Sequence, residues 1–482
     1  MKTLTRKPIF WVLFVLIALL SGGVAMRYFS SAFPIVTLDL RMDRAHALRE
    51  ARQLAERYDW GPNGYRQAAS FELDEATQNL VELEGGGSAA FREMLRGDVY
   101  SPYTWRVRHF SSGETLETTI LFTPQGLPYG FRQKLPEDEP GESLDTEQAL
   151  ELAEHAATQD WGIDLGEYER VEVGSERRSG GRIDHSLVYQ RTDLEVAEGR
   201  YRLRLVVGGD RLTGLVHFVD IPEAFERRYS EMRSVNSAIG AGGFVGLVFF
   251  LLIGCVGGLS YLLRRRWVLW RQPIKWGIFV SLLMALTSAN RWPLLWMDYD
   301  TAVPAGTFVL QEAVFILAGF LGLALLYSLS FMAAESLTRR AFPHHLQLWT
   351  AWSPQGLGSI QLLGRTATAY LLVALFFAYE VLLYLVSGKY FGWWTPSEVL
   401  FDPDILATYF PWLSSITISL QAGFWEECLF RAVPLAGAAL LGRRFGHRRT
   451  WIIAALPPIS TPISMVVEQL RMFSLPFLKS CS

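Results

Sequence analysis

The second half of the chain contains five apolar stretches that are each long enough to cross a lipid bilayer. A helix of roughly 20 apolar residues spans the hydrocarbon core, because each residue adds about 1.5 Å along the helix axis. We therefore expect a polytopic α-helical membrane domain over residues 237–456. Its predicted spans are about residues 238–263, 276–297, 308–334, 367–387 and 405–441.

A further apolar run lies near the N-terminus, where residues 9–26 carry no charge and follow three basic residues. Two interpretations of this run remain open. It is either a signal anchor that stays in the membrane, or a signal peptide that is cleaved near Ala25. The length of the run favours an anchor over residues 1–27, and both interpretations predict that the following segment is exported.

Residues 28–236 are polar and charged, and they contain an internal repeat. Each copy has an aspartate, an Ala-Leu pair on a helical period and an Asp-Trp-Gly turn, and alternation typical of strands follows. We expect two tandem α+β modules, at residues 28–142 and 143–236, so the predicted fold class is mixed. The repeated elements are Asp43, Ala47-Leu48 and Asp59-Trp60-Gly61 in the first copy, and Asp145, Ala149-Leu150 and Asp160-Trp161-Gly162 in the second.

The charges of the predicted loops indicate an orientation. Basic residues gather in the loops after the first, third and fifth membrane-domain spans, whereas the other loops are acidic. Basic loops stay in the cytoplasm, which places residues 28–236 outside it. We therefore expect an integral protein of the plasma membrane, the inner membrane in a bacterium. The basic loop residues are Arg264, Arg265, Arg266, Arg271, Lys275, Arg339, Arg340, Arg365, Arg443, Arg444, Arg448 and Arg449.

The net charge and the cysteines argue against two other classes of protein. A formal net charge of -3 does not suit a nucleic-acid-binding protein, which needs basic residues to neutralise phosphates. Cys255, Cys428 and Cys481 all lie outside the polar region, so no disulfide framework is expected there. The expected partners are the lipid bilayer and a membrane-held substrate, without nucleic acid.

Ionisable residues inside predicted spans are candidates for function, because a charge in hydrocarbon is costly. Arg291 and Glu312 lie at similar depth, and a structural ion pair between them is the favoured interpretation. Glu380 lies in the outer half of its span, where it could line a cavity or cap a neighbouring helix.

The strongest signal is a group of three charges in the last span, Glu426, Glu427 and Arg431. On a helix, Glu427 and Arg431 are four residues apart and can form an ion pair on one face. Glu426 is rotated by about 100° and points elsewhere. A carboxylate in such a place can act as a general base toward water. The alternative is a polar clamp between helices, which would be costly with three charges at membrane depth.

The pattern Glu426-Glu427-x-x-x-Arg431 resembles the EExxxR motif of the CPBP family, the CAAX-prenyl-protease and bacteriocin-processing (Abi) intramembrane peptidases. The resemblance implies a helical membrane enzyme in which Glu426 activates a water molecule for peptide hydrolysis. Glu427 and Arg431 would form the supporting pair of this catalytic motif. The resemblance covers about residues 270–456 by layout and six residues by motif. It also implies a membrane-held peptide or protein substrate that is cut near the cytosolic face.

The chain departs from the family pattern after Arg431. The family has two later motifs, FxxxH and HxxxN/D, whose histidines help to hold the water or a metal. His447 fits neither spacing, and we expect it to lie on the surface. A metal role for His344-His345, which precede the motif, is the less favoured interpretation. The metal ligands are therefore unknown, and a divalent metal remains open as a cofactor of a longer form.

The end of the chain has an unusual composition. Residues 450–456 begin like another span, but prolines and serines dominate residues 457–482. Adjacent prolines make poor membrane helix. We expect residues 457–482 to be an atypical tail, either of a truncated or frame-shifted product or of a genuinely divergent protein.

The sequence thus predicts an intramembrane endopeptidase of the CAAX-protease-like type, with low or no activity in this chain because the later histidine motifs are missing. The alternative is a non-catalytic membrane receptor or scaffold whose exported modules bind a ligand. No prenylation site, nucleotide-binding loop or zinc motif is visible in the sequence.

Overall fold

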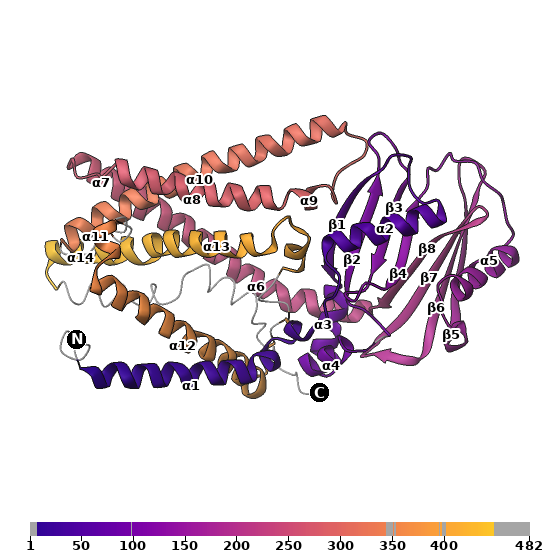
Figure 1. Cartoon of the computed structure of the whole chain (residues 1–482), viewed down its shortest axis with the longest axis horizontal. Coiled ribbons are helices and arrows are strands. Elements are labelled where there is room, and N and C mark those ends of the chain that lie inside the picture. Colours follow the sequence, from indigo (N-terminus) through magenta and orange to yellow (C-terminus); the bar gives the residue numbers. More distant parts are fainter. Residues whose placement is uncertain are drawn as a thin grey trace.

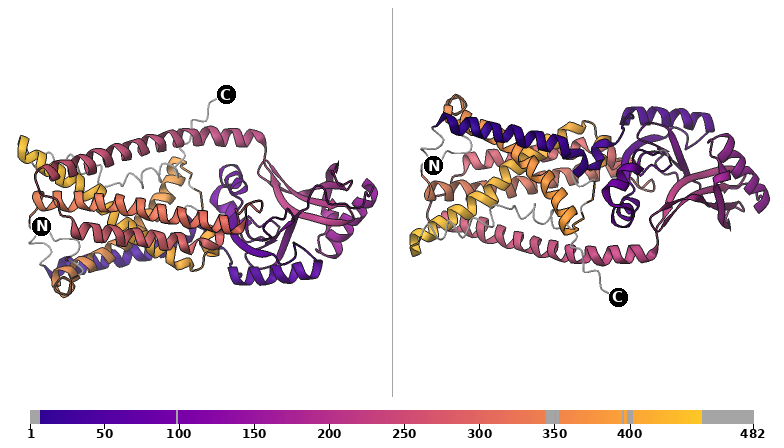
Figure 2. Two further views of the ribbon diagram at one scale, coloured as in Figure 1. Left: turned by 90° about the horizontal axis from the view of Figure 1, so that it is seen from above. Right: turned by 90° about the horizontal axis from the view of Figure 1, so that it is seen from below.

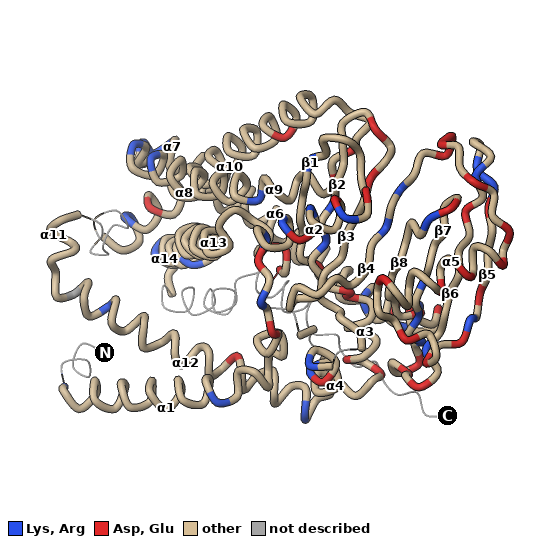
Figure 3. Tube along the Cα trace, turned by 45° about the vertical axis from the view of Figure 1, so that its right-hand side comes forward, with Lys and Arg blue, Asp and Glu red and all other residues tan. Residues whose placement is uncertain are grey.

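The computed structural model of the chain describes residues 7–97, 99–343, 350, 353–394, 396–397 and 402–447. The molecule is elongated, with a β-sheet domain at one end and a bundle of long helices that extends away from it (Figure 1). The fold is mixed, as the sequence predicts, with an antiparallel sheet and a helical apolar part. Charged residues concentrate on the sheet domain, whereas the long helices are mostly uncharged (Figure 3).

One antiparallel sheet of eight strands forms the centre of the polar domain, in the order β1-β2-β3-β4-β8-β7-β6-β5. Two four-stranded meanders therefore meet edge to edge at β4 and β8. Two register pairs join them, Phe131 with Leu215 and Arg132 with Gly214. The strands are β1 Arg66–Leu73, β2 Tyr103–Phe110, β3 Glu117–Phe122, β4 Pro128–Lys134, β5 Tyr168–Arg177, β6 Ile183–Val196, β7 Gly199–Gly208 and β8 Arg211–Asp220.

A helix precedes each meander, α2 at Arg44–Tyr58 and α5 at Thr146–Gln159. Asp43 and Asp145 cap the two helices by accepting hydrogen bonds from backbone N–H groups of the first turn. Each helix faces the sheet with three buried alanines spaced four residues apart, which lets helix and sheet approach closely. These alanines are Ala47, Ala51, Ala55, Ala149, Ala153 and Ala157.

The helix-and-four-strand order thus occurs twice, but the two halves share one core. The first half differs by a pair of helices between β1 and β2, α3 at Glu75–Glu84 and α4 at Gly87–Met94. The described residues outside the long helices also contain three short 3₁₀ helices. These are η1 at Pro34–Thr37, η2 at Leu165–Glu167 and η5 at Pro403–Ala407.

Among the described residues, four helices are long and apolar enough to cross a membrane, namely Pro8–Ala32, Glu223–Arg264, Ala305–Ala341 and Leu362–Phe391. They cover the N-terminal run and three of the five other predicted spans. The predicted spans 276–297 and 405–441 lie mainly in α8 and in the helix that begins at Pro411, both of which pack in the same bundle. The helices are α1 Pro8–Ala32, α6 Glu223–Phe250, η3 Leu251–Gly257, α7 Gly258–Arg264, α8 Arg271–Asn290, α9 Trp292–Leu295, α10 Ala305–Ala341, α11 Pro354–Leu357, α12 Ile360–Phe391, α13 Pro411–Glu426, η6 Glu427–Ala432 and α14 Val433–Phe445.

Helix α1 lies along α12 as part of the bundle (Figure 2). The ring of Phe33 packs against Tyr384 with centroids 5.0 Å apart, and Phe29 packs against Phe377 at 6.4 Å.

The sheet domain is attached to the acidic loops at the near end of the bundle. Arg108 on β2 donates hydrogen bonds to three backbone carbonyl groups of residues 296–299. The backbone N–H of Phe71 donates to Asp404 at 3.2 Å, and the indole of Trp394 donates to Glu82 at 2.9 Å. The basic ends of α7 and α14 lie at the opposite end of the bundle (Figure 1).

Candidate active site

The EExxxR motif lies where an α-helix widens into a π-helical turn. Helix α13 ends at Glu426, and η6 then continues through Ala432 into α14 without a break in the chain direction. The sequence predicts an ordinary helix here, so the π turn is a difference between expectation and structure. Such turns occur often at functional sites, because the extra residue per turn re-aims the neighbouring side chains.

The π turn preserves the ion pair that the four-residue spacing predicts. Arg431 donates a hydrogen bond from its guanidinium to the Glu427 carboxylate. The side chains of Arg431 and Glu427 have exposed fractions of 47% and 52%, so the pair lies on the outside of the described bundle. Glu426, the neighbouring carboxylate, is half-buried. The two glutamates of the motif therefore have different surroundings.

The opposite side of the motif segment is anchored in the largest apolar cluster of the bundle. Leu429 and Phe430 are buried there together with residues of α7 and α10. The rings of Phe430 and Phe250 stack with centroids 6.2 Å apart. A second π segment, η3, borders the same cluster through Cys255. This packing fixes the rotation of the helix and so determines which motif residues face outward.

A polar contact next to the motif was not anticipated from the sequence. The indole N–H of Trp425 donates to the Ser330 hydroxyl at 3.3 Å, and the Cys255 thiol lies 3.9 Å from the same oxygen. One turn further along α10, Arg339 donates to Glu335 at 2.6 Å. Glu335 and Arg339 are four residues apart, and this spacing in an apolar helix was the signal that could have found the pair.

The far end of the motif helix is tied to α10. Arg443 donates hydrogen bonds to the carbonyl oxygens of Arg340 at 2.8 Å and Ala341 at 2.7 Å. These are carbonyls of the last turn of α10, which lack partners within their own helix. The motif segment is thus held at both ends, through Trp425 and through Arg443.

Other expected site residues do not join the motif. His447 is exposed and follows the end of α14 in a left-handed conformation, with φ of 58°. His344-His345 and the segments 450–456 and 457–482 lie outside the described residues. Within the described ranges, no group of three or more His, Cys, Asp or Glu side chains could hold a metal ion. The expected pairing of Arg291 with Glu312 is wrong, because Arg291 pairs instead with Asp402 at 3.1 Å.

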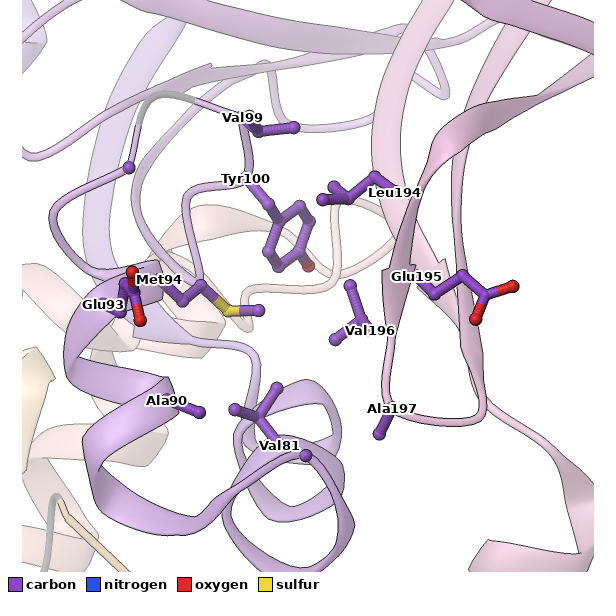
Figure 4. Close-up of a pocket in the computed structure, with 12 residues that line it drawn as sticks. Val81, Ala90, Glu93, Met94, Val99, Tyr100, Leu194, Glu195, Val196 and Ala197 are labelled. Carbon is purple, nitrogen blue, oxygen red and sulfur yellow. The ribbon is translucent and has the colours of Figure 1, made fainter.

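The sheet domain contains cavities that lie apart from the motif. One, of about 390 Å³, lies between α4 and the β6–β7 hairpin and is mostly apolar (Figure 4). Met94 and Tyr100 face Leu194 and Val196 across it. Two further cavities lie on the face of the sheet opposite α2 and α5.

No family model, no curated protein and no solved structure matches the chain. The assignment of a function therefore depends on the motif, its geometry and the architecture around it.

Proposed function

We propose that the helical half of this protein is an intramembrane peptidase of the CAAX-protease-like type, with Glu426 as the general base. The observation that supports this most is the placement of the motif on a π turn within an apolar helix. There Arg431 pairs with Glu427, while Glu426 has a separate and more buried position. The mixed environment of two adjacent carboxylates is typical of a site in which one reacts and the other supports.

In this mechanism, Glu426 accepts a proton from a water molecule as the water oxygen attacks the carbonyl carbon of the scissile peptide bond. The peptide C–N bond breaks after the proton is passed to the leaving nitrogen. The Glu427–Arg431 pair holds the turn that carries Glu426. A general base contributes roughly 10²–10⁴-fold to a rate, and donors to the developing oxyanion must supply the rest. The low or absent activity expected from the sequence stays a prediction, which a hydrolysis assay tests.

We further propose that the motif lies toward the cytosolic face and that the sheet domain lies outside the cytoplasm. The basic ends of α7, α10 and α14, which support this orientation, are distant from the sheet domain. Reporter fusions after residue 150 and after residue 270 should report opposite sides of the membrane. The same side for both fusions would contradict this orientation.

The peptidase proposal can be tested in membranes that contain the full chain. New N-termini of membrane proteins are labelled and compared between the parent and the Glu426→Gln variant. We expect a small set of cleavage products in the parent that disappear in the variant, because the amide cannot accept the proton. Glu380→Gln is the matched control, since it changes another carboxylate within a long apolar helix. Products that persist in Glu426→Gln would refute the role of Glu426.

The second candidate is a non-catalytic receptor or scaffold. The attachment of the sheet domain to the loops of the bundle favours it, because a ligand-induced change in the domain would reach α13 through Asp404 and α12 through Trp394. In the labelling experiment, a complete absence of Glu426-dependent products would favour this candidate over the peptidase.

A further inference from the structure

The face of the sheet opposite α2 and α5 is open over most of its width. Side chains alternate between the two faces of a strand, so the residues next to the buried Leu203 and Leu205 face outward on β7. The loop of residues 296–303 covers the outer face only at its β1–β2 end, where Phe110 packs against Tyr299. Over the middle of β3, β4, β8, β7 and β6 the described residues form no such cover. The loop after β4 borders this face at one end, where Arg182 donates hydrogen bonds to the carbonyl oxygens of Pro136 and Glu139.

Two cavities on this open face form one continuous groove. The larger has a volume of about 1200 Å³ and the smaller about 290 Å³. Both are lined by Arg132, Val216 and Phe218, so they meet at this point. We call the combined cavity the seam groove, because it crosses the junction between β4 and β8 where the two repeats join.

Two arginines of the seam groove have no ion-pair partner in the part of the chain that the structure describes. Arg132 and Arg204 both line it, and neither forms a salt bridge with any residue that the structure describes. Other arginines of this face are paired, Arg106 with Glu72 and Arg202 with Asp220. An arginine that the fold leaves unpaired in a cavity is available to bind an anion.

The register of the strands places these two arginines on either side of β8. Arg132 on β4 lies opposite Gly214, and Arg204 on β7 lies opposite Val216. Neighbouring strands are about 4.8 Å apart, and the two register partners are two residues, or about 7 Å, apart along β8, so the two Cα atoms are separated by about 12 Å. Gly214 has no side chain, and a Cβ at this position would lie 3.2 Å from the Cβ of Val206. Arg204 is further held over the Phe218 ring, with its guanidinium carbon 4.9 Å from the ring centroid.

We propose that the seam groove binds an extended peptide segment that carries carboxylate side chains. A guanidinium donates two parallel hydrogen bonds to a carboxylate, so a ligand with carboxylate groups suits the two arginines. The apolar floor formed by Leu121, Val216 and Phe218 suits an aliphatic side chain. A volume of about 1200 Å³ exceeds the roughly 300–1000 Å³ of a typical small-molecule site, which favours a peptide. This site does not depend on the proposed peptidase activity.

The spacing of the arginines also specifies the peptide. In an extended chain, side chains two residues apart point the same way and are about 7 Å apart. Carboxylates at alternate positions can therefore reach Arg132 and Arg204 together, because both arginine side chains are long. An aliphatic residue two positions further would reach the apolar floor.

A binding experiment with the full chain in detergent tests the proposal. The probe is an acetylated and amidated hexapeptide with glutamate at its second and fourth positions, leucine at its sixth and alanine elsewhere. A second probe replaces both glutamates with glutamine. We expect the glutamate peptide to bind at least tenfold more tightly, and its affinity to fall as sodium chloride is raised from 50 to 500 mM, because salt screens charge pairs.

Single substitutions identify the site. Arg132→Gln and Arg204→Gln should each weaken binding of the glutamate peptide by about tenfold, which corresponds to about 1.4 kcal/mol. Arg202→Gln is the matched control, because Arg202 lies on the same strand and already pairs with Asp220 at 3.0 Å. Melting curves check that each variant is folded. Absence of binding, equal binding of the two peptides, or unchanged binding in both Arg132→Gln and Arg204→Gln would overturn the proposal.

Discussion

The indole rings of Trp60 and Trp161 stack at the junction of the two repeats, with their centroids 6.3 Å apart and their planes 15° from parallel. Phe131 contacts both rings, at 4.2 Å from Trp60 and 5.3 Å from Trp161. Each tryptophan belongs to one of the two Asp-Trp-Gly turns, and the glycines after them have positive φ, 90° at Gly61 and 65° at Gly162. The repeated turn therefore has a structural role, because it brings both copies together over β4.

The aromatic stack predicts a measurable coupling between the two repeats. Trp60 is 8% exposed, and Trp60→Ala should lower the free energy of unfolding by about 3–5 kcal/mol. Trp161 is half-buried, so Trp161→Ala should cost less. Because both rings share Phe131, the double variant should deviate from additivity by about 0.5–1.5 kcal/mol. Unfolding of the four proteins measured by near-ultraviolet circular dichroism checks this, and strict additivity would contradict the stack.

The sequence predicted the repeated units because their signals are local. Asp43 and Asp145 begin helices and the alanine period marks their buried faces, and both features can be recognised within a single helix. The joining of β4 to β8 could not be predicted, because it depends on pairing between residues far apart, such as Phe131 and Leu215. The α3–α4 insertion was also missed, since nothing in the second copy corresponds to it.

The sequence predicted the local contacts of the candidate site but not the contacts that depend on the tertiary fold. The four-residue spacing of Glu427 and Arg431 predicted their ion pair correctly. The π turn could not be predicted, because it depends on how Leu429 and Phe430 pack against other helices. The prediction that Arg291 pairs with Glu312 was wrong for the same reason. Asp402, its actual partner, lies more than a hundred positions away in the sequence, and only the tertiary fold brings it close.

The burial of Asp404 leads us to expect that the stability of the contact between the sheet domain and the bundle depends on pH. Burial, with a smaller contribution from Asp402 and Glu72, raises the pKa of Asp404 from 3.8 to about 6, although the N–H of Phe71 opposes this. A raised carboxyl pKa means that the folded protein binds the proton more tightly than the unfolded chain. The stabilisation is therefore complete below about pH 4 and is lost as the pH rises through 6.

Asp404→Asn should remove this pH dependence, because the amide is neutral at every pH and its oxygen can still accept from Phe71. Melting temperatures of parent and variant between pH 4.5 and 7.5 provide the measurement. We expect the variant to gain stability relative to the parent as the pH rises. Asp402→Asn serves as the control, since Asp402 is exposed and pairs with Arg291. Parallel curves for the parent and Asp404→Asn would contradict this prediction.

Glu82 forms a second point of attachment between the sheet domain and the bundle. It is 5% exposed, and it accepts hydrogen bonds from Trp394 and Ser397 beyond the end of α12. Glu82→Ala should lower stability by about 1–3 kcal/mol, because it leaves the buried Ser397 hydroxyl and the half-buried Trp394 indole without their acceptor. Glu84→Ala, which removes a more exposed ion pair with Arg228, should have a smaller effect. Equal melting temperatures of the two variants would contradict the role of Glu82.

The ion pair between Glu427 and Arg431 leads to a separate prediction about the stability of the protein. Glu427→Gln or Arg431→Ala leaves one charge without its partner in the helical bundle, and removal of one member of such a pair is destabilising. Both variants should therefore melt below the parent. The double variant Glu427→Gln/Arg431→Gln should recover part of the loss, since it leaves no single charge behind. A double variant that is less stable than either single variant would contradict this account.

The central claim, that Glu426 is the general base, is tested most directly by hydrolysis and melting measured on the same preparations. The parent, Glu426→Gln and Glu427→Gln are reconstituted in liposomes with a quenched fluorescent peptide held in the bilayer by an apolar segment, at an excess of protein. We predict slow hydrolysis by the parent, none by Glu426→Gln at an unchanged melting temperature, and a lowered melting temperature for Glu427→Gln. Full hydrolysis by folded Glu426→Gln would contradict the claim.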